Sequence, residues 1–165
     1  MKSLYIVRHA KSSWDYPELK DIERPLMKKG REKTMKVIKY LLGQEILVDS
    51  ILSSPAVRAY ETAKMIAEAL HYPVERIDVR DRIYMGDADD LTTMLMELPD
   101  EFRSVMLVGH NPELTDLVNM FNNKKIDILP TSGVVYIVFR TDEWESILNA
   151  KRKTRFMVYP GMLEK

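Results

Sequence analysis

Near its beginning the chain runs Leu4-Tyr5-Ile6-Val7-Arg8-His9, an apolar run that ends abruptly in an arginine and a histidine. The four apolar residues are continuous rather than alternating, and they include two β-branched side chains and one aromatic ring. This composition is typical of a strand that is covered on both faces of a sheet. We therefore expect a buried strand that delivers Arg8 and His9 to one edge of a sheet.

Three further segments share the composition of this strand. They are Ser50-Ile51-Leu52-Ser53, Val105-Met106-Leu107-Val108 and Val134 to Phe139. Between the segments, apolar residues recur at helical spacing and form four stripes. The stripes are Met35, Ile38, Leu41 and Leu42; Ala56, Tyr60, Ala63, Ile66, Ala67 and Leu70; Leu91, Met94, Leu95 and Leu98; and Leu114, Leu117, Val118 and Phe121. Strands that alternate with helices predict an α/β fold, a three-layer helix/sheet/helix sandwich around a mostly parallel sheet.

The C-terminal part is expected to add one strand of opposite direction. Glu145 to Ala150 is interpreted as an antiparallel edge strand, because Asp142 and Glu143 suit a tight hairpin after Val134 to Phe139. No fixed-period repeat or low-complexity linker divides the 165 residues, so we expect a single domain over residues 1–165. The tail, about residues 151–165, is expected to pack on that domain or to be partly mobile.

The charges balance, with 25 Lys and Arg against 25 Asp and Glu. Binders of nucleic acid or of membrane surfaces draw much of their free energy from excess positive charge, so we expect neither partner. The longest uncharged stretch, Ile128 to Phe139, is too short to span a membrane, and the first apolar run is too short for a signal peptide. We expect a cytoplasmic protein and a monomer.

Two predicted helix starts directly follow strands and are typical of anion binding. Ser54-Pro55 and Asn111-Pro112 each combine a capping side chain with a proline suited to the first helical position. In an open parallel sheet, ligands bind at the carboxyl ends of the strands, where helix N-termini present free N–H groups. Both helix starts are therefore expected at a binding edge.

Four basic side chains converge on that edge. Arg8 and His9 follow the first strand, Arg58 lies one turn into the second helix, and His110 follows Gly109. Arginine binds phosphoryl oxygens with two donors, so Arg8 and Arg58 suit a phosphoryl group in transfer.

The absence of cysteine narrows the chemistry at this edge. A chain with no cysteine has no disulfide framework, no thiolate metal site and no cysteine nucleophile. His9 is then the expected nucleophile, and the two guanidinium groups should hold its pKa below the usual value of about 6.5. His110 is expected to donate to the phosphoryl oxygens.

Three motifs resemble those of the histidine phosphatase superfamily, which includes the phosphoglycerate mutases. Leu4 to Ala10 is similar to its Arg-His motif, Ser53 to Ala63 to its second motif, and Val108 to Pro112 to its third. The short length, the segment Asp21 to Leu26 followed by Gly30, and Thr131-Ser132-Gly133 resemble specifically the SixA-type phosphohistidine phosphatases. The order is preserved from about Leu4 to Phe139, which argues against coincidence.

The resemblance implies a phosphatase that removes the phosphoryl group from protein phosphohistidine, with His9 phosphorylated during turnover. It implies that Arg8, Arg58 and His110, together with Asn111, bind the phosphoryl group. No cofactor and no metal is implied. The implied partner is a signalling or phosphocarrier protein that carries phosphohistidine.

The chain departs from the family pattern in its acidic residues. Many superfamily phosphatases carry a glutamate general acid after the third strand, whereas Arg80 to Asp87 contains no glutamate and leaves Asp81 and Asp87 as candidates. A weak acid site favours phosphohistidine, because imidazole can leave as a neutral molecule whereas an alkoxide needs a proton. A carboxylate at Asp15, where mutase-like members have asparagine, would repel phosphate unless it is turned away or paired with a cation.

Two alternatives stay open. One is a small-molecule phosphomonoesterase of the same superfamily, which would hydrolyse sugar phosphates faster than phosphohistidine. The other is a non-catalytic module that binds a phosphoryl group, which would release phosphate from neither.

Overall fold

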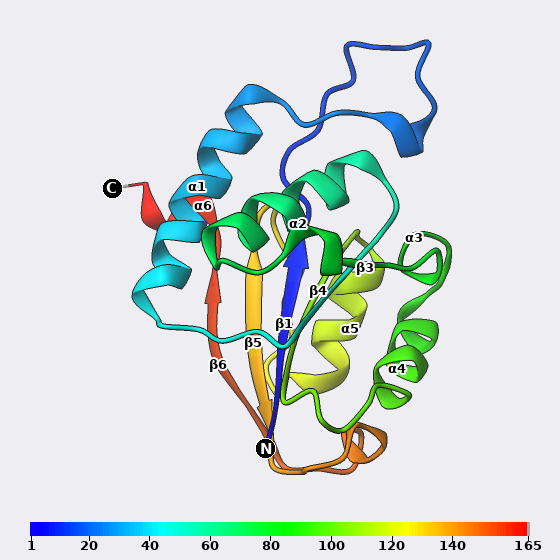
Figure 1. Ribbon diagram of the computed structural model, residues 1–165, viewed down its shortest axis with the longest axis vertical. Coiled ribbons are helices and arrows are strands. Elements are labelled where there is room, and N and C mark those ends of the chain that lie inside the picture. Colours follow the sequence, from blue (N-terminus) through cyan, green and yellow to red (C-terminus); the bar gives the residue numbers. More distant parts are fainter. Residues whose placement is uncertain (165) are drawn as a thin grey trace.

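The computed structural model describes residues 1–164 and shows a six-stranded sheet between two layers of helices (Figure 1). The strands are β1 (Lys2–Arg8), β2 (Ser50–Ser53), β3 (Asp78–Val79), β4 (Ser104–Gly109), β5 (Val134–Phe139) and β6 (Arg152–Val158). The helices are α1 (Lys28–Gly43), α2 (Val57–Ala69), α3 (Arg82–Met85), α4 (Ala88–Met96), α5 (Glu113–Phe121) and α6 (Pro160–Leu163). Three short 3-10 turns complete the fold: η1 (Asp21–Glu23), η2 (Val74–Arg76) and η3 (Trp144–Ser146).

The strands lie in the order β3-β2-β4-β1-β5-β6. The first four of these are mutually parallel, and β5 is antiparallel to both β1 and β6. Parallel neighbours need long crossovers, which the helices supply. The expected three-layer α/β fold with a mostly parallel sheet is therefore confirmed.

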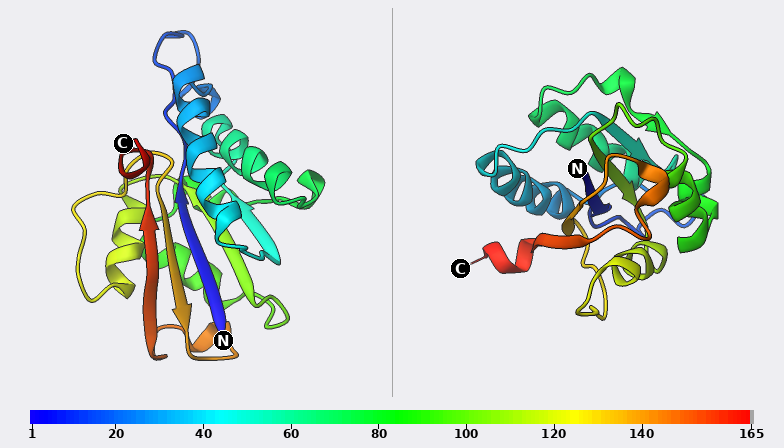
Figure 2. Two further views of the ribbon diagram at one scale, coloured as in Figure 1. Left: turned by 90° about the vertical axis from the view of Figure 1, so that its left-hand side faces the viewer. Right: turned by 90° about the horizontal axis from the view of Figure 1, so that it is seen from below.

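The sheet is packed on both faces, which explains the continuous apolar character of its central strands. On one face, Leu4 and Ile6 of β1 join a core with α4 and α5. On the other, Tyr5 and Val7 join a core with α1 and α2. Figure 2 shows these helix pairs on opposite sides of the sheet.

An edge strand antiparallel to its neighbour exists, but the prediction of its position was wrong. The strand that runs against the parallel strands is β5, which lies inside the sheet between β1 and β6. Residues 145–150 lie in η3 and the turn after it, and the strand antiparallel to β5 at the edge is β6. Trp144 is fully buried, and its indole nitrogen donates to the carbonyl of Phe102 at 2.8 Å. Burying this ring folds the connection into a turn instead of a tight hairpin.

Two details of the helices also differ from expectation. In α1 the buried stripe runs through Thr34, Val37, Ile38 and Leu41, whereas Met35 and Leu42 are about half exposed. The proline of each predicted helix start lies before the first helical residue, since α2 begins at Val57 and α5 at Glu113. The hydroxyl of Ser54 accepts from the N–H of Ala56 at 3.1 Å, ahead of α2 and not as its N-cap.

None of the helices in residues 1–164 is long and apolar enough to cross a membrane.

Candidate active site

The carboxyl ends of β1, β2 and β4 lie at one edge of the sheet and open into a pocket of about 430 Å³. The backbone N–H of His9 donates to the carbonyl of Gly109 at 3.1 Å, which extends the pairing of β1 with β4 to this edge. The pocket is lined by all five residues predicted for the site, namely Arg8, His9, Arg58, His110 and Asn111, and by Lys11, Ser12, Ser13, Trp14, Asp15, Arg24, Met27 and Thr131.

The His9 ring is fixed through one of its two nitrogens. Nδ1 lies 2.7 Å from the carbonyl oxygen of Ala10, so Nδ1 carries the proton and Nε2 keeps its lone pair. The backbone of Ala10 is itself held, because its N–H donates to the hydroxyl of Thr62 in α2 at 2.9 Å. Burial, with smaller effects from Arg58, Arg8 and Arg24, lowers the pKa of His9 to about 4, although the bond to Ala10 raises it. The ring is therefore neutral at pH 7, as predicted.

Arg8 is held from the loop that precedes β5. Its Nη1 donates to the carbonyl of Leu129 at 3.1 Å. In the same loop the N–H of Ser132 lies 3.1 Å from the carbonyls of both Arg8 and His9. Ser132 has a φ of 61°, a left-handed conformation that this double contact helps to hold. The arginine and histidine at the end of β1 are thus braced from β5 as well as from β4.

Arg58, the second residue of α2, is bound by one residue of η1. Its Nη1 donates to the backbone carbonyl of Asp21 at 2.7 Å, and its Nη2 to the Asp21 carboxylate at 2.9 Å. The same carboxylate accepts from Nε of Arg24 at 3.1 Å and from the hydroxyl of Tyr84 at 2.7 Å. Partial burial raises the pKa of Asp21, but the bonds from Tyr84 and Arg58 outweigh it and lower the pKa to about 2.

His110 lies on the opposite side of the pocket floor, with its ring centroid 5.2 Å from that of His9. Its Nε2 is 2.7 Å from the hydroxyl of Ser54, the residue that follows β2. The ring of Tyr84 packs against it edge to face at 5.5 Å. Burial first, and then His9 and Arg58, lower the pKa of His110 to about 3.

Three buried nitrogen atoms at this site have no hydrogen-bond partner within residues 1–164. They are Nε of Arg8, Nε of Arg58 and Nδ1 of His110, and the one other such side-chain atom is Oγ of Ser104. Buried polar groups are normally paired, because an unpaired one costs about 1–3 kcal/mol. Unpaired donors that gather at one place suit an anionic ligand with several acceptor oxygens.

Asn111 lines the pocket with its amide already paired inside the protein. Nδ2 donates to the carbonyl of Leu129 at 2.8 Å, and Oδ1 accepts from the hydroxyl of Thr115 at 2.9 Å. Asn111 and Arg8 therefore share Leu129 as an acceptor, which ties the start of α5 to the end of β1.

The candidate acids are not brought together with these residues. Asp87 is exposed and caps α4, where its carboxylate accepts from the N–H of Asp90 at 2.9 Å. Asp81 is also exposed, and neither of the two lines the pocket. Asp15 does line it, as an exposed residue whose N–H donates to the hydroxyl of Ser13 at 3.0 Å.

Asp21 and Arg24 are the site residues to which sequence analysis gave no role. Arg24 lines the pocket, and its Nη1 donates to the hydroxyl of Ser12 at 2.9 Å. The one signal for them in the sequence is the Asp21 to Leu26 segment, which resembles the family but does not by itself assign a role to Asp21 or Arg24. Hydrophobic periodicity says nothing about a polar loop of this kind.

Packing outside the pocket requires a glycine at position 109. A Cβ at this position would stand 2.9 Å from Cγ2 of Ile83 and 3.6 Å from Cδ2 of Leu114. The glycine is needed for the packing of α3 against β4.

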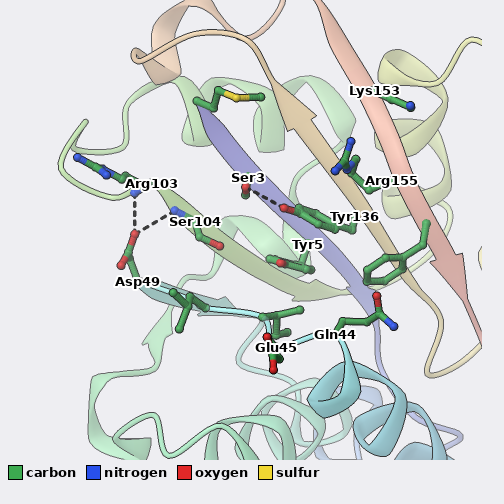
Figure 3. A pocket seen from close by; sticks show the side chains of 14 residues that line it. Ser3, Tyr5, Gln44, Glu45, Asp49, Arg103, Ser104, Tyr136, Lys153 and Arg155 are labelled. Atoms are coloured by element: carbon green, nitrogen blue, oxygen red, sulfur yellow. Dashed lines mark hydrogen bonds between the residues drawn. The ribbon is translucent and has the colours of Figure 1, made fainter.

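A larger hollow, about 770 Å³, lies at the other end of the sheet and contains none of the predicted residues (Figure 3). The rings of Tyr5 and Tyr136 stack on each other there at 4.3 Å, and Tyr136 bonds to Ser3 through the two hydroxyls at 3.2 Å. Phe156 packs against Tyr136 in an edge-type contact at 5.3 Å. The chemically active side chains gather in the smaller pocket.

No group of three or more histidine, aspartate or glutamate side chains in residues 1–164 is arranged to hold a metal ion.

The comparisons with known proteins agree with this geometry. The profile of the Histidine phosphatase superfamily (branch 1) matches residues 4–113. An uncharacterised chloroplastic protein of Arabidopsis thaliana is 29% identical over 152 residues, which make up 87% of this chain and 69% of that protein. Phosphohistidine phosphatase SixA of Escherichia coli (strain K12) is 27% identical over 116 residues, 70% of this chain and 71% of SixA.

The structure comparison shows the same fold. A structure of the protein histidine phosphatase SixA complexed with tungstate superposes with a TM-score of 0.84 and 23% identity, covering 98% of this chain and 99% of that one. The family resemblance noted in the sequence is confirmed by the match of residues 4–113.

Proposed function

The chain belongs to the histidine phosphatase superfamily, and on that basis we propose that it removes the phosphoryl group from protein phosphohistidine through a phosphorylated His9, without a metal ion. The partner in this proposal is a signalling or phosphocarrier protein. The sequence similarity to phosphohistidine phosphatase SixA of Escherichia coli supports the choice of substrate.

The observation that carries the proposal is the state of His9. Its Nδ1 is engaged by the carbonyl of Ala10, and its pKa is about 4, so Nε2 has a free lone pair throughout the neutral range. The guanidinium groups of Arg8 and Arg58 and the ring of His110 line the same pocket. A nucleophile beside three cationic or hydrogen-bonding groups is the arrangement that phosphoryl transfer requires.

The unpaired donors supply the binding of the phosphoryl group. Nε of Arg8 and Nε of Arg58 are buried N–H groups without a partner in residues 1–164, so a phosphoryl oxygen brought within reach of them would supply a hydrogen bond that the protein itself does not. His110 contributes a third donor when its proton resides on Nδ1 and its Nε2 accepts from the hydroxyl of Ser54. The structural relative holds tungstate, which is also a tetrahedral oxyanion.

The reaction has two steps. In the first, Nε2 of His9 attacks phosphorus and the new N–P bond forms while the N–P bond to the substrate imidazole breaks; the substrate ring leaves neutral because its other nitrogen already carries a proton. In the second, a water oxygen attacks the same phosphorus and the bond to Nε2 of His9 breaks; both water protons stay on the phosphate, which leaves as dihydrogen phosphate. Arg8 and Arg58 balance the charge of the three equatorial oxygens in both steps.

The acidic residues favour a nitrogen leaving group over an alkoxide. Asp21, which binds Arg58, has a pKa of about 2 and is ionised at pH 7, and Asp81 and Asp87 lie outside the pocket. Asp15 lines the pocket as an exposed residue at its rim. An alkoxide needs a proton from such a group, whereas the imidazole of phosphohistidine can leave as a neutral molecule. This supports phosphohistidine rather than a sugar phosphate as substrate.

A paired assay tests the proposal. Phosphate release is measured from a phosphohistidine protein and from a sugar phosphate, in the presence of a chelator, with the unaltered chain and His9→Ala. We expect faster release from phosphohistidine, no release by His9→Ala, and an acid-labile phosphoryl label on His9 of the unaltered chain. His71→Ala is the matched control, because His71 is exposed and does not line the pocket.

The other outcomes select the alternatives. Faster hydrolysis of the sugar phosphate identifies a phosphomonoesterase, and release from neither substrate identifies a binding module. Full activity in His9→Ala contradicts the covalent mechanism.

A further inference from the structure

The loop that connects β1 to α1 stands above the carboxyl edge of the sheet, as Figures 1 and 2 show. It carries Trp14, whose side chain is 76% exposed although its loop neighbours Ser12 and Ser13 are buried. Among the described residues that line the pocket, Trp14 alone carries a large aromatic side chain. The exposed ring therefore stands at the mouth of the pocket, where a bound substrate can reach it.

The ring is held in place and not simply left free. The guanidinium carbon of Arg24 lies 3.5 Å from its centroid, so one face of the indole is covered. Arg24 is 8% exposed, and its bonds to Asp21 and Ser12 fix the guanidinium. Trp14 therefore presents its other face to solvent on a rigid support, which lowers the entropy lost when a ligand packs on it.

The position of the ring relates it to the departing half of the substrate. Phosphoryl transfer proceeds with the attacking and leaving atoms roughly in line. Nε2 of His9 attacks from the buried floor, since His9 is 7% exposed, so the leaving group lies toward the open side of the pocket. That is the side on which the exposed Trp14 stands.

We propose that Trp14 is a specificity-determining residue that stacks on the aromatic leaving group of the substrate. The inference rests on the proposed function, in which this group is the imidazole of phosphohistidine. A planar ring fits against the free indole face, and such aromatic contacts are favourable beyond the area they bury. A leaving group without a ring gains nothing from the contact.

The experiment compares two substrates with the same phosphorus–nitrogen bond. One is a peptide containing phosphohistidine, whose leaving group is imidazole, and the other is phosphoramidate, whose leaving group is ammonia. For Trp14→Ala we expect the ratio of kcat/KM for the peptide to kcat/KM for phosphoramidate to fall about tenfold, mostly through KM. Trp14→Phe keeps a flat ring and is expected to restore most of the ratio.

Tyr16→Ala is the matched control. Tyr16 is 48% exposed, lies in the same loop and does not line the pocket, so the ratio should stay within about twofold. Inhibition by vanadate serves as a second measurement, because it reports the binding of the phosphoryl group alone and should be the same in Trp14→Ala as in the unaltered chain.

Three results overturn the inference. An unchanged ratio in Trp14→Ala excludes the stacking, and a loss of vanadate inhibition means that Trp14 acts only by holding Arg24. If the unaltered chain hydrolyses no phosphohistidine, the proposed function fails and this inference fails with it. That result is recognised before any variant is measured.

Discussion

The carboxylate of Asp21 lies 2.9 Å from Nη2 of Arg58, and the backbone carbonyl of Asp21 accepts from Nη1 of the same guanidinium at 2.7 Å. One residue of the loop thereby fixes two of the three nitrogens of the arginine and leaves Nε for a ligand. Asp21 is a positioning residue for Arg58, and a 37-residue separation in sequence hides the relationship.

Replacement of Asp21 by alanine should weaken phosphoryl binding. Arg58, Arg24 and Tyr84 lose their common acceptor, and we expect kcat/KM to fall about tenfold, with a rise in KM. Asp21→Asn keeps one acceptor oxygen and should lose less. Steady-state kinetics of both variants check this, and an Asp21→Ala variant with unaltered KM contradicts the positioning role.

Stability should depend on pH through the two histidines. Their pKa values in the folded protein, about 4 for His9 and about 3 for His110, lie below the ordinary histidine pKa of 6.5. The unfolded chain then binds more protons below that value, so the free energy of unfolding is highest above pH 6.5 and falls as the pH drops toward 4. Thermal melts at stepped pH measure the loss, and His9→Gln should reduce it. A stability that stays flat between pH 7 and pH 4 contradicts the shifts.

Asp21 contributes in a different pH window. Its pKa of about 2 lies below the ordinary aspartate pKa of 3.8. Its contribution to the free energy of unfolding is therefore present above pH 3.8 and is lost as the pH falls toward 2. The side chain is 47% exposed, so solvent screening keeps this contribution below about 1 kcal/mol. A comparison of Asp21→Asn with the unaltered chain at pH 5 and pH 2.5 should show a smaller difference at pH 2.5 than at pH 5.

Gly30 should tolerate no side chain. A Cβ there would stand 2.4 Å from the backbone oxygen of Lys11, two residues after His9, so that either α1 or the loop has to move. We expect Gly30→Ala to lower the free energy of unfolding by about 2 kcal/mol and to reduce activity. Gly43→Ala is the control in the same helix, since nothing lies within 4 Å of its Cβ. It should leave activity unchanged and raise stability by about 0.5 kcal/mol. Denaturant unfolding distinguishes the two.

Inorganic phosphate should raise the melting temperature of the unaltered chain, because it binds the folded state only. Arg58→Lys keeps the charge but loses the fork of donors, and the rise should largely disappear. Arg80→Lys is the control, since Arg80 pairs with Asp78 and does not line the pocket. An equal rise in all three proteins shows that phosphate binds elsewhere.

Apolar patterning predicted the central strands well and the edges poorly. The predicted and observed bounds coincide for β2 and β5. β5 is a continuous apolar segment, and in β2 a serine at each end flanks the apolar pair Ile51 and Leu52. β6 was missed because Arg152, Lys153 and Arg155 make it resemble a solvated tail, although edge strands often carry such charges. The two-residue strand β3 is too short for any periodicity to mark.

The site residues also fall into a group that the sequence predicts and a group that it does not. Arg8, His9, Arg58 and His110 follow strands or begin helices, so topology places them at one edge. Asp21, Arg24 and Trp14 belong to an irregular segment whose path depends on side-chain contacts with Arg58 and Ser12. Sequence periodicity contains no information about such contacts, which are seen only in the folded structure.

The loop between β1 and α1 is closed at its base by backbone contacts, next to the bond from Arg24 to the hydroxyl of Ser12. Ser12 and Leu26 form an antiparallel bridge, and the N–H of Met27 donates to the carbonyl of Lys11 at 2.9 Å. Main-chain bonds of this kind survive a change of side chains, so the loop between them forms an exchangeable cassette, provided that Asp21 is kept to position Arg58. Evolution, or a protein engineer, can retune the substrate range by replacing this cassette while the sheet and its histidines stay as they are.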